Sequence, residues 1–171
     1  DLMIDSGANA RSVRVEIQPF TLVGATTRAG LLSSPMRSRF GIHLRLDYYE
    51  PPTLQRIVER SASLLSMPID PEAARLIANR SRGTPRIANN LLRWTRDYVQ
   101  ANKKTSITAD HAACALEMLG VDHAGLDEMD KKILSVIMDH HEGGPVGLSN
   151  LAAAVGEEAH TLEEVHEPYL I

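Results

Sequence analysis

The stretch RSRGTPRIAN, residues 80–89, contains the start of a helix. Thr84 suits the position before a helix, and Pro85 suits the first helical position, where a backbone N–H would be unpaired in any case. One face of the segment that follows is largely apolar, with Ile87, Leu91, Trp94, Thr95 and Tyr98 at helical spacing. The stretch therefore predicts an amphipathic helix that begins at Pro85.

Three more helices are predicted around this one. Pro51-Pro52 ends the preceding pattern, and a helical face then follows that consists of Leu54, Ile57, Val58, Ser61 and Leu65. Asp70-Pro71-Glu72 combines an N-cap residue, a proline and an acid, which together mark another helix start. Thr108 is the expected cap of a helix that runs to about Leu119. These helices predict a small all-α domain over residues 50–120.

A linker and three shorter helices follow. Residues 120–125 begin and end with glycine, which indicates a linker. Apolar spacing then indicates short helices at about 127–139, 147–155 and 160–166. This pattern predicts a helix-turn-helix or winged-helix domain over residues 121–171, truncated because its wing strands are expected beyond Ile171.

The first 49 residues have strand patterns instead. Residues 1–18 alternate weakly around a turn-forming Asp-Ser-Gly-Ala-Asn segment, which predicts a β-hairpin. Residues 20–25, Phe-Thr-Leu-Val-Gly-Ala, form a nearly continuous apolar run that is typical of a strand buried in a parallel sheet. Residues 42–46 alternate and predict a further strand. We therefore expect residues 1–49 to be part of an α/β domain, a partial parallel-sheet remnant with a β-hairpin.

Composition favours a soluble cytoplasmic protein with packed cores. Apolar residues make up 43% of the 171 residues, and no apolar run is long enough to cross a membrane. The net charge of −4 conceals an asymmetry, because residues 1–104 carry +7 and residues 105–171 carry −11. A positive region suits a phosphate-bearing ligand, whereas an acidic segment repels a DNA backbone.

Three short motifs carry candidate chemistry. Thr26-Thr27 follows the apolar run, at the edge where open α/β sheets bind ligands, although a Thr pair also caps helices. Arg37 and Arg39 flank a serine, and an arginine fork suits phosphate oxygens as well as surface ion pairs. Arg86 lies in a first helical turn, where free N–H groups already favour an anion. Each motif is weak alone, so a structural role stays open for all three.

The order of these motifs resembles the AAA+ ATPases, with their sensor 1, arginine-finger and sensor 2 regions. More closely, the chain resembles the RuvB family of Holliday-junction branch-migration motors within that class. The stretches that carry the resemblance spread over nearly the whole chain, at residues 20–30, 34–41, 80–89, 125–130, 143–148 and 167–171. The function that it implies is an ATP-dependent DNA helicase or translocase of recombination and repair.

The resemblance assigns roles to individual residues. Thr26 or Thr27 would be sensor 1, and Thr27 is preferred by analogy with other AAA+ proteins. Arg39 would be the arginine finger that acts on the ATP of the adjacent subunit. Tyr49 would contact the nucleotide near its base, and Arg86 would be sensor 2. In this assignment Thr27 orients the attacking water and the two arginines supply positive charge.

The resemblance also implies cofactors and partners. This sequence contains no Walker A or Walker B motif. ATP and Mg²⁺ would therefore be bound mainly by a segment outside it. The hairpin would bind RuvA, with contacts from its apolar residues Leu2, Ile4, Val13 and Val15. Full-length subunits would form a homohexameric ring on duplex DNA at a Holliday junction, with RuvC as a further candidate partner.

DNA contacts in the winged-helix domain are expected to be few. Where the family usually places a DNA-contacting arginine, this chain has Ala159, and the basic wing residues would follow Ile171. His160 and His166 lie near enough to contact a DNA backbone, but histidines are mostly neutral at pH 7. Both chain ends look cut, so we expect a fragment of a longer bacterial cytoplasmic protein.

A non-catalytic DNA-binding regulator, built from a helical bundle and a winged helix, is the alternative function. It would explain residues 52–171 but would leave Thr26-Thr27 and Arg39 unexplained. Metal binding is not expected, because the seven histidines show no third ligand at a credible spacing and are predicted to lie on the surface. Asp127, Glu128 and Asp130 are expected to stabilise a helix start.

The chain is predicted not to hydrolyse ATP by itself, because it lacks the Gly-x-x-x-x-Gly-Lys-Thr loop that cradles the phosphates. The measurement is phosphate release from Mg-ATP by the purified chain of 171 residues. A rate equal to that of buffer is expected. Turnover that persists through repurification and scales with protein concentration would contradict the resemblance.

Overall fold

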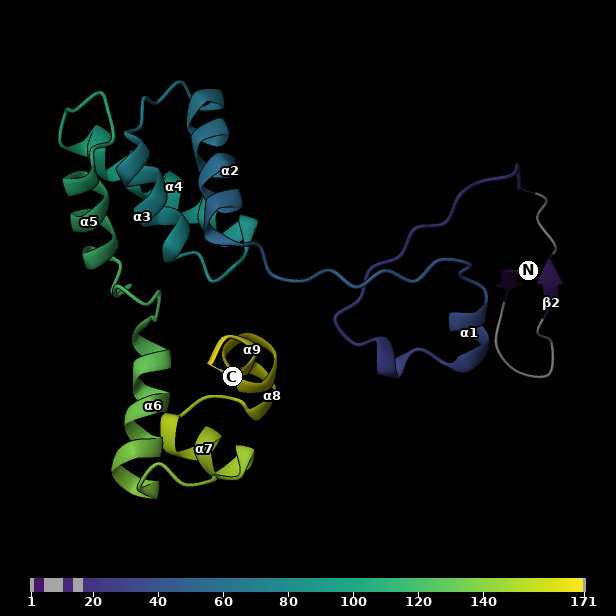
Figure 1. Cartoon of the computed structure of the whole chain (residues 1–171). Helices are drawn as coiled ribbons and strands as arrows, with labels where there is room; N and C mark the ends of the chain where they lie inside the picture. The colour runs from purple at the N-terminus through teal and green to yellow at the C-terminus, as the bar shows by residue number, and fades with distance from the viewer. Residues whose placement is uncertain (1, 5–10, 14–16, 171) are drawn as a thin grey trace. The chain divides into compact units, whose positions relative to one another are not determined.

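The computed structural model describes residues 2–4, 11–13 and 17–170, with side chains placed for residues 17–170 (Figure 1). The chain divides into two compact units, Asp1–Arg45 and Leu46–Ile171. Both hydrophobic cores of the described residues lie in the second unit.

The first unit contains short elements. Strands β1 (Leu2–Ile4) and β2 (Arg11–Val13) pair antiparallel with Leu2 opposite Val13, which is the pairing expected of a hairpin. A 3-10 turn, η1 (Ala29–Leu31), precedes helix α1 (Ser34–Ser38). Ser33 begins α1, because its hydroxyl accepts a hydrogen bond from the N–H of Met36 at 3.4 Å.

The predicted parallel-sheet remnant is wrong for the described residues. Residues 20–25 and 42–46 form no strand, and their apolar side chains are exposed, with 86% for Val23 and 83% for Leu44. A strand that is buried on both faces needs hydrogen-bonding neighbours and covering helices. The described part of this unit supplies neither, so the apolar run alone does not produce a strand.

Four helices form the α2–α5 bundle at the positions that the sequence predicts: α2 (Pro51–Leu64), α3 (Pro71–Asn79), α4 (Pro85–Ala101) and α5 (Ala109–Met118). Thr108 caps α5 by accepting a hydrogen bond from the N–H of His111 at 3.3 Å. Asp70 and Thr84 occupy N-cap positions, but their side chains make no capping hydrogen bond. The proline at the first position therefore marks the start of α3 and α4.

The core of this bundle is built from the apolar faces of its helices. α2 and α5 each pack against α3 and α4. Side chains with no exposed surface include Leu54, Val58, Ile77, Leu92 and Val99. The loop before α3 is joined to the loop before α5 by two backbone hydrogen bonds, from Asp70 N–H to the Ile107 carbonyl (2.9 Å) and from Ile107 N–H to the Pro68 carbonyl (2.8 Å). These bonds hold the two helix starts side by side.

A second, smaller set of helices forms the α6–α9 bundle: α6 (Glu128–His141), α7 (Leu148–Val155), α8 (Ala159–Thr161), the π-helical turn η2 (Leu162–His166) and α9 (Glu167–Leu170). Its core consists of Ile133, Val136, Leu151, Ala152, Val155 and Leu162. Glu142 and Gly156 end α6 and α7 in the left-handed conformation, a common way to terminate a helix. The order and lengths of these helices match the predicted helix-turn-helix or winged-helix pattern.

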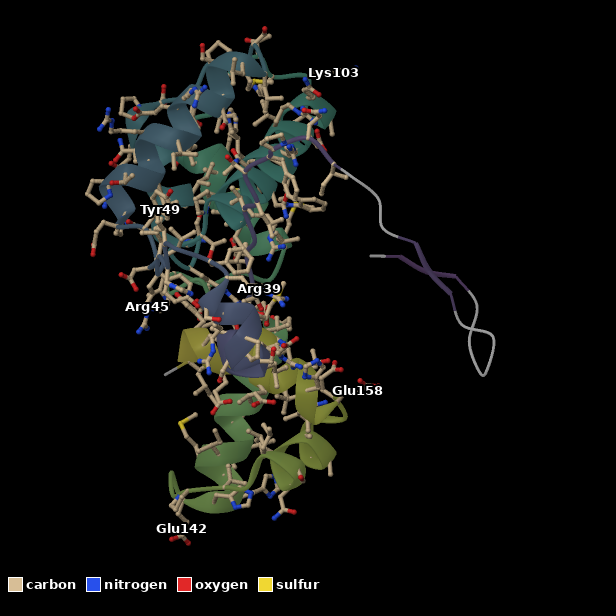
Figure 2. The ribbon with its side chains drawn as sticks, turned by 90° about the vertical axis from the view of Figure 1, so that its right-hand side faces the viewer. Arg39, Arg45, Tyr49, Lys103, Glu142 and Glu158 are labelled. Atoms are coloured by element: carbon tan, nitrogen blue, oxygen red, sulfur yellow. The ribbon has the colours of Figure 1, made fainter. Side chains whose placement is uncertain are left out.

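Charged side chains lie at several loops of the two bundles. Lys103 lies just after α4, and Glu142 and Glu158 lie at loops of the α6–α9 bundle (Figure 2). None of the helices within residues 17–170 combines the length and the apolar character that a membrane crossing requires.

Truncation of Leu92 to Ala is predicted to destabilise the α2–α5 bundle by about 2–5 kcal/mol, because a fully buried side chain would leave a cavity between α4 and its neighbours. Leu64→Ala is the matched control, since Leu64 is 75% exposed, and it should change stability by less than about 0.5 kcal/mol. Urea unfolding followed by far-UV circular dichroism measures both. Equal losses for the two variants would contradict the assignment of Leu92 to the core.

Candidate functional site

Thr27 and Arg39 both lie in the first unit and both are exposed. The hydroxyl of the neighbouring Thr26 accepts a hydrogen bond from the N–H of Arg28 at 3.0 Å, so Thr26 makes a local turn contact. Arg39 directly follows α1 as its C-cap residue, and its N–H bonds back to the Met36 carbonyl at 3.3 Å (Figure 2). The side chains of Thr27 and Arg39 therefore both lie at the surface of the first unit.

Tyr49 and Arg86 lie in the second unit. A backbone hydrogen bond joins Tyr49 to the turn that leads into α4, the helix that contains Arg86. The N–H of Tyr49 donates to the Gly83 carbonyl at 2.8 Å, and Arg86 is the second residue of α4, three positions further on. Tyr49 is 48% exposed, and Arg86 is exposed as well. The structure thus brings together the residue expected near the nucleotide base and the residue expected to sense the phosphates.

The turn between α3 and α4 has a strained backbone. Arg82 and Gly83 both have positive φ, at 51° and 64°. A Cβ atom on Gly83 would lie 2.6 Å from the Cβ of Tyr48, so only glycine fits against this tyrosine. Two left-handed residues in a row reverse the chain so that α4 begins beside residues 48 and 49.

The side chain of Arg82 points into a group of residues from the α6–α9 bundle, here called the Arg82 cluster: Arg82, Asp127, Asp130, His166 and Tyr169. Arg82 Nε donates to the Gly125 carbonyl at 2.9 Å, and Nη2 lies 3.1 Å from Asp127 Oδ2 and in contact with Asp130 Oδ2. Nδ1 of His166 lies 2.7 Å from Asp130 Oδ1. The guanidinium also lies over the Tyr169 ring, with its central carbon 4.9 Å from the ring centroid.

Burial makes this cluster costly to disturb. The side chain of Asp130 has no exposed surface, and those of His166 and Arg82 are 8% and 12% exposed. Both carboxylate oxygens of Asp130 have partners. Oδ1 lies beside Nδ1 of His166, and Oδ2 contacts Arg82 and also accepts the N–H of Asp127 at 3.0 Å. Removal of one partner would leave a buried charge without compensation.

The cluster does not suit a metal ion, although Asp127, Asp130 and His166 each offer a ligand atom within 4.8 Å of the others. The Arg82 guanidinium already contacts both carboxylates. A cation between these acids would be placed against a fixed positive charge. The arrangement is therefore an ion-pair network rather than a metal centre.

The structure corrects the prediction for His166 but leaves His160 at the surface. His166 is 7% exposed, so it is neither a surface histidine nor able to contact a DNA backbone. No local sequence pattern indicates this burial, because the partner of His166, Asp130, lies 36 residues away. His160 Nε2 lies 3.2 Å from Glu164 Oε2 on the same helical segment.

The cluster changes the acidity of two of its members. Burial alone would raise the pKa of the Asp127 carboxyl, but the N–H groups of Asp130 and Met129 and the charges of Arg82 and His166 together lower that pKa below its usual value. Burial raises the pKa of the Tyr169 hydroxyl. Asp127 therefore carries its negative charge more readily than a free aspartate, which suits both its cap of α6 and its contact with Arg82.

The position of Arg82 in this cluster is not predicted from the sequence. Its partners Gly125 and Asp130 lie 43 and 48 residues away, and no local pattern connects them. One available signal is the Asp127-x-x-Asp130 spacing, which predicts a capping box and hence an acidic helix start. The structure contains such a box, because Asp127 accepts the N–H of Asp130 and Asp130 accepts the N–H of Asp127, each at 3.0 Å.

Three family models match the chain in succession. The model for the Holliday junction DNA helicase RuvB P-loop domain matches residues 1–46, and the RuvB AAA lid domain matches residues 49–122. The RuvB C-terminal winged helix domain matches residues 123–171. The α2–α5 bundle therefore coincides with the lid model and the α6–α9 bundle with the winged-helix model.

Individual relatives agree with the family models. The chain is 58% identical over all 171 residues to the Holliday junction branch migration complex subunit RuvB of Protochlamydia amoebophila, of which it covers 52%. It is 60% identical to the subunit of the same name from Flavobacterium psychrophilum, with 100% of this chain and 50% of that protein covered. The solved Thermotoga maritima RuvB Holliday junction branch migration motor matches with a TM-score of 0.83 and 56% identity, over 90% of this chain and 52% of that chain. The chain thus spans about half the length of the relatives that it matches.

The charge of Asp127 is predicted to stabilise the fold fully above about pH 4 and progressively less in stronger acid. Because the folded pKa is lowered, this contribution is complete above the unfolded pKa of about 3.9 and is lost as the pH falls through the folded pKa. The parent should therefore be more stable than Asp127→Asn from pH 5 to 7, and the difference should vanish in stronger acid. Urea unfolding midpoints of the parent and of Asp127→Asn, taken from pH 3 to 7, measure this difference in stability.

Asp139→Asn is the control for this titration, because Asp139 is an exposed carboxylate on the same helix. From pH 5 to 7, Asp127→Asn should lose more stability than Asp139→Asn. A difference for Asp127→Asn that is flat from pH 3 to 7 would contradict the role of this charge.

Proposed function

The chain belongs to the RuvB family, and from that premise we propose that it forms the nucleotide-sensing and DNA-facing half of an ATP-driven motor that moves Holliday junctions. The observation that supports the proposal is the backbone hydrogen bond from Tyr49 to Gly83, three residues before Arg86, together with the exposure of Tyr49 and Arg86. In the proposed organisation, residues 1–49 belong to the ATPase domain, 50–120 form the lid and 121–171 form the winged helix.

The lid would sense the nucleotide through Arg86. The first N–H groups of α4 and the positive end of its helix dipole favour an anion at this point, and Arg86 adds a mobile charge there. Tyr49 would contact the nucleotide near its base, because its backbone is bonded to the same turn. A change from triphosphate to diphosphate would remove the anion that Arg86 approaches.

Residues of the first unit would act on the reacting phosphate. Thr27 would orient the attacking water through its hydroxyl, and Arg39 would reach the ATP of an adjacent subunit. A planar guanidinium that approaches the γ-phosphate stabilises the charge of the transition state. The exposed positions of Thr27 and Arg39 are compatible with these roles.

This chain supplies no fitting site for Mg²⁺ among its described residues. Asp127 and Asp130, which with His166 offer ligand atoms within 4.8 Å of one another, are already paired with Arg82. We therefore assign the cation of Mg-ATP to other parts of the motor.

The proposed partners follow the same division of the chain. The hairpin would bind RuvA through Leu2, Ile4 and Val13, whereas Val15 lies outside the described residues. Subunits would assemble as a hexameric ring on duplex DNA in the bacterial cytoplasm, with RuvC as a further partner. His160 is the weakest proposed DNA contact, because a glutamate carboxylate already lies 3.2 Å from its ring.

A non-catalytic DNA-binding regulator is disfavoured. Such a protein would need only the two helical bundles, whereas the P-loop domain model matches residues 1–46 as well. It would also leave the exposed Thr27 and Arg39 without a role.

In a full-length protein that carries this sequence, Arg39→Ala is predicted to reduce ATP hydrolysis by about 10³-fold or more, because the transition-state charge loses its guanidinium. Binding of ATP should be largely retained, since the arginine would act from a neighbouring subunit. Steady-state phosphate release and binding of a fluorescent ATP analogue measure the two quantities.

Arg37→Ala is the matched control, because Arg37 lies on the same short helix and is also exposed. It should retain hydrolysis close to that of the parent. A loss of ATP binding as severe as the loss of turnover in Arg39→Ala would instead indicate a structural role for Arg39.

A further inference from the structure

We propose that Arg82 is a positioning residue that makes the α2–α5 bundle and the α6–α9 bundle move as one body when the start of α4 responds to a nucleotide. The inference rests on the proposed function for the nucleotide response, but the rigid connection itself is argued from the contacts of Arg82 alone.

One side of the α3–α4 turn faces the nucleotide-contact candidates. The Gly83 carbonyl accepts the N–H of Tyr49, and Gly83 lies against Tyr48 with no room for a side chain. The Arg82 carbonyl accepts the hydroxyl of Thr84 at 3.1 Å, which ties the turn to the first residues of α4. A displacement of Arg86 at the start of α4 would therefore displace the backbone of Arg82.

The other side of the same turn faces the α6–α9 bundle. Arg82 holds the backbone of residue 125 through Nε and the start of α6 through two carboxylates. Asp130 in turn contacts His166, which lies in η2 near the C-terminal end of the bundle. One side chain thus bonds to the connection between the bundles and to the first helix of the second bundle, and reaches η2 through Asp130.

The connection between the bundles is fixed rather than loose, which makes rigid transmission possible. Arg80 Nη1 donates to the Val121 carbonyl at 3.2 Å, and Lys131 Nζ donates to the Gly120 carbonyl at 2.7 Å. Asp122 Oδ1 accepts the N–H groups of Ala124 and Leu126, each at 2.9 Å. Residues 120–125, expected from sequence to be a linker, form a hydrogen-bonded turn that includes Leu126.

Close packing adds to these bonds. Gly125 has a φ of 81°, and a Cβ atom there would lie 3.0 Å from the Arg80 carbonyl oxygen and 3.1 Å from the Tyr169 hydroxyl. The Tyr169 hydroxyl in turn donates to the Ala124 carbonyl. Arg82 lies at the centre of these contacts, stacked on the Tyr169 ring and 12% exposed. Its loss would remove both the charge pairing and the surface on which Tyr169 packs.

The first experiment measures the rigidity of the connection in the 171-residue chain. Spin labels are placed on Cys114, the single cysteine, which is exposed on α5, and on Ala154→Cys, which is exposed on α7. Pulsed electron paramagnetic resonance should give one narrow distance distribution for the parent and a broadened one for Arg82→Met. Arg75→Met is the matched control, because Arg75 pairs with Glu72 on its own helix, and it should match the parent.

Arg82→Lys keeps the test decisive if Arg82→Met does not fold. A lysine retains a charge opposite Asp130 but has no fork to bond the Gly125 carbonyl at the same time. Its distribution should be broader than that of the parent, with unchanged far-UV circular dichroism. A distribution as narrow as the parent's in either folded variant would overturn the proposal.

The second experiment measures the coupling in a full-length protein that carries this sequence. Arg82→Met should retain ATP hydrolysis without DNA but lose at least about five-fold of the stimulation by duplex DNA. Stimulation equal to the parent's, or basal hydrolysis that falls together with it, would overturn the positioning role. If the parent itself shows no ATP hydrolysis, the proposed function fails, whereas the distance measurement still decides whether Arg82 joins the bundles.

Discussion

The buried ion pair between Arg82 and Asp130 is the interaction on which the arrangement of the second unit depends. Two charges that are removed from water gain little net stability, but the loss of either one leaves the other unpaired. Here each charge has additional partners, because Arg82 also bonds a backbone carbonyl and Asp130 also accepts a backbone N–H. The pair therefore specifies one relative placement of the two bundles rather than simply adding to stability.

This constraint gives the short turn between α3 and α4 two functions. Its backbone holds Tyr49 and sets the start of α4, while its side chain at position 82 holds the α6–α9 bundle. Arg82 and Gly83 both have positive φ, which reverses the chain at this turn. The Gly83 carbonyl bonds to Tyr49, while the Arg82 side chain bonds to the Gly125 carbonyl. A nucleotide response at Arg86 would thus reach the DNA-facing bundle through neighbouring residues, without a long chain of intermediate contacts.

The sequence predicts what local physics controls and misses what depends on distant partners. Helix starts such as Thr84-Pro85 and Asp127 are set by residues within one turn, so α4 and α6 begin where expected. The apolar run at residues 20–25 has the composition of a central strand, but a strand also requires neighbours, which composition does not reveal. Thr27, Arg39, Tyr49 and Arg86 were identified through a family resemblance, and their roles stay predictions. His166 was misplaced because its burial depends on Asp130, 36 residues away.

The most direct test of the central claim is a set of three distances in the full-length protein, with ADP and with a non-hydrolysable ATP analogue. Labels at Cys114 and Ala154→Cys report on the two bundles, and a label at Gly30→Cys, where an added Cβ meets no atom within 4 Å, reports on the ATPase domain. The account predicts that both distances from position 30 differ between the two nucleotide states while the distance from 114 to 154 stays constant. A change in the 114–154 distance, or movement of the α2–α5 bundle alone, would contradict it.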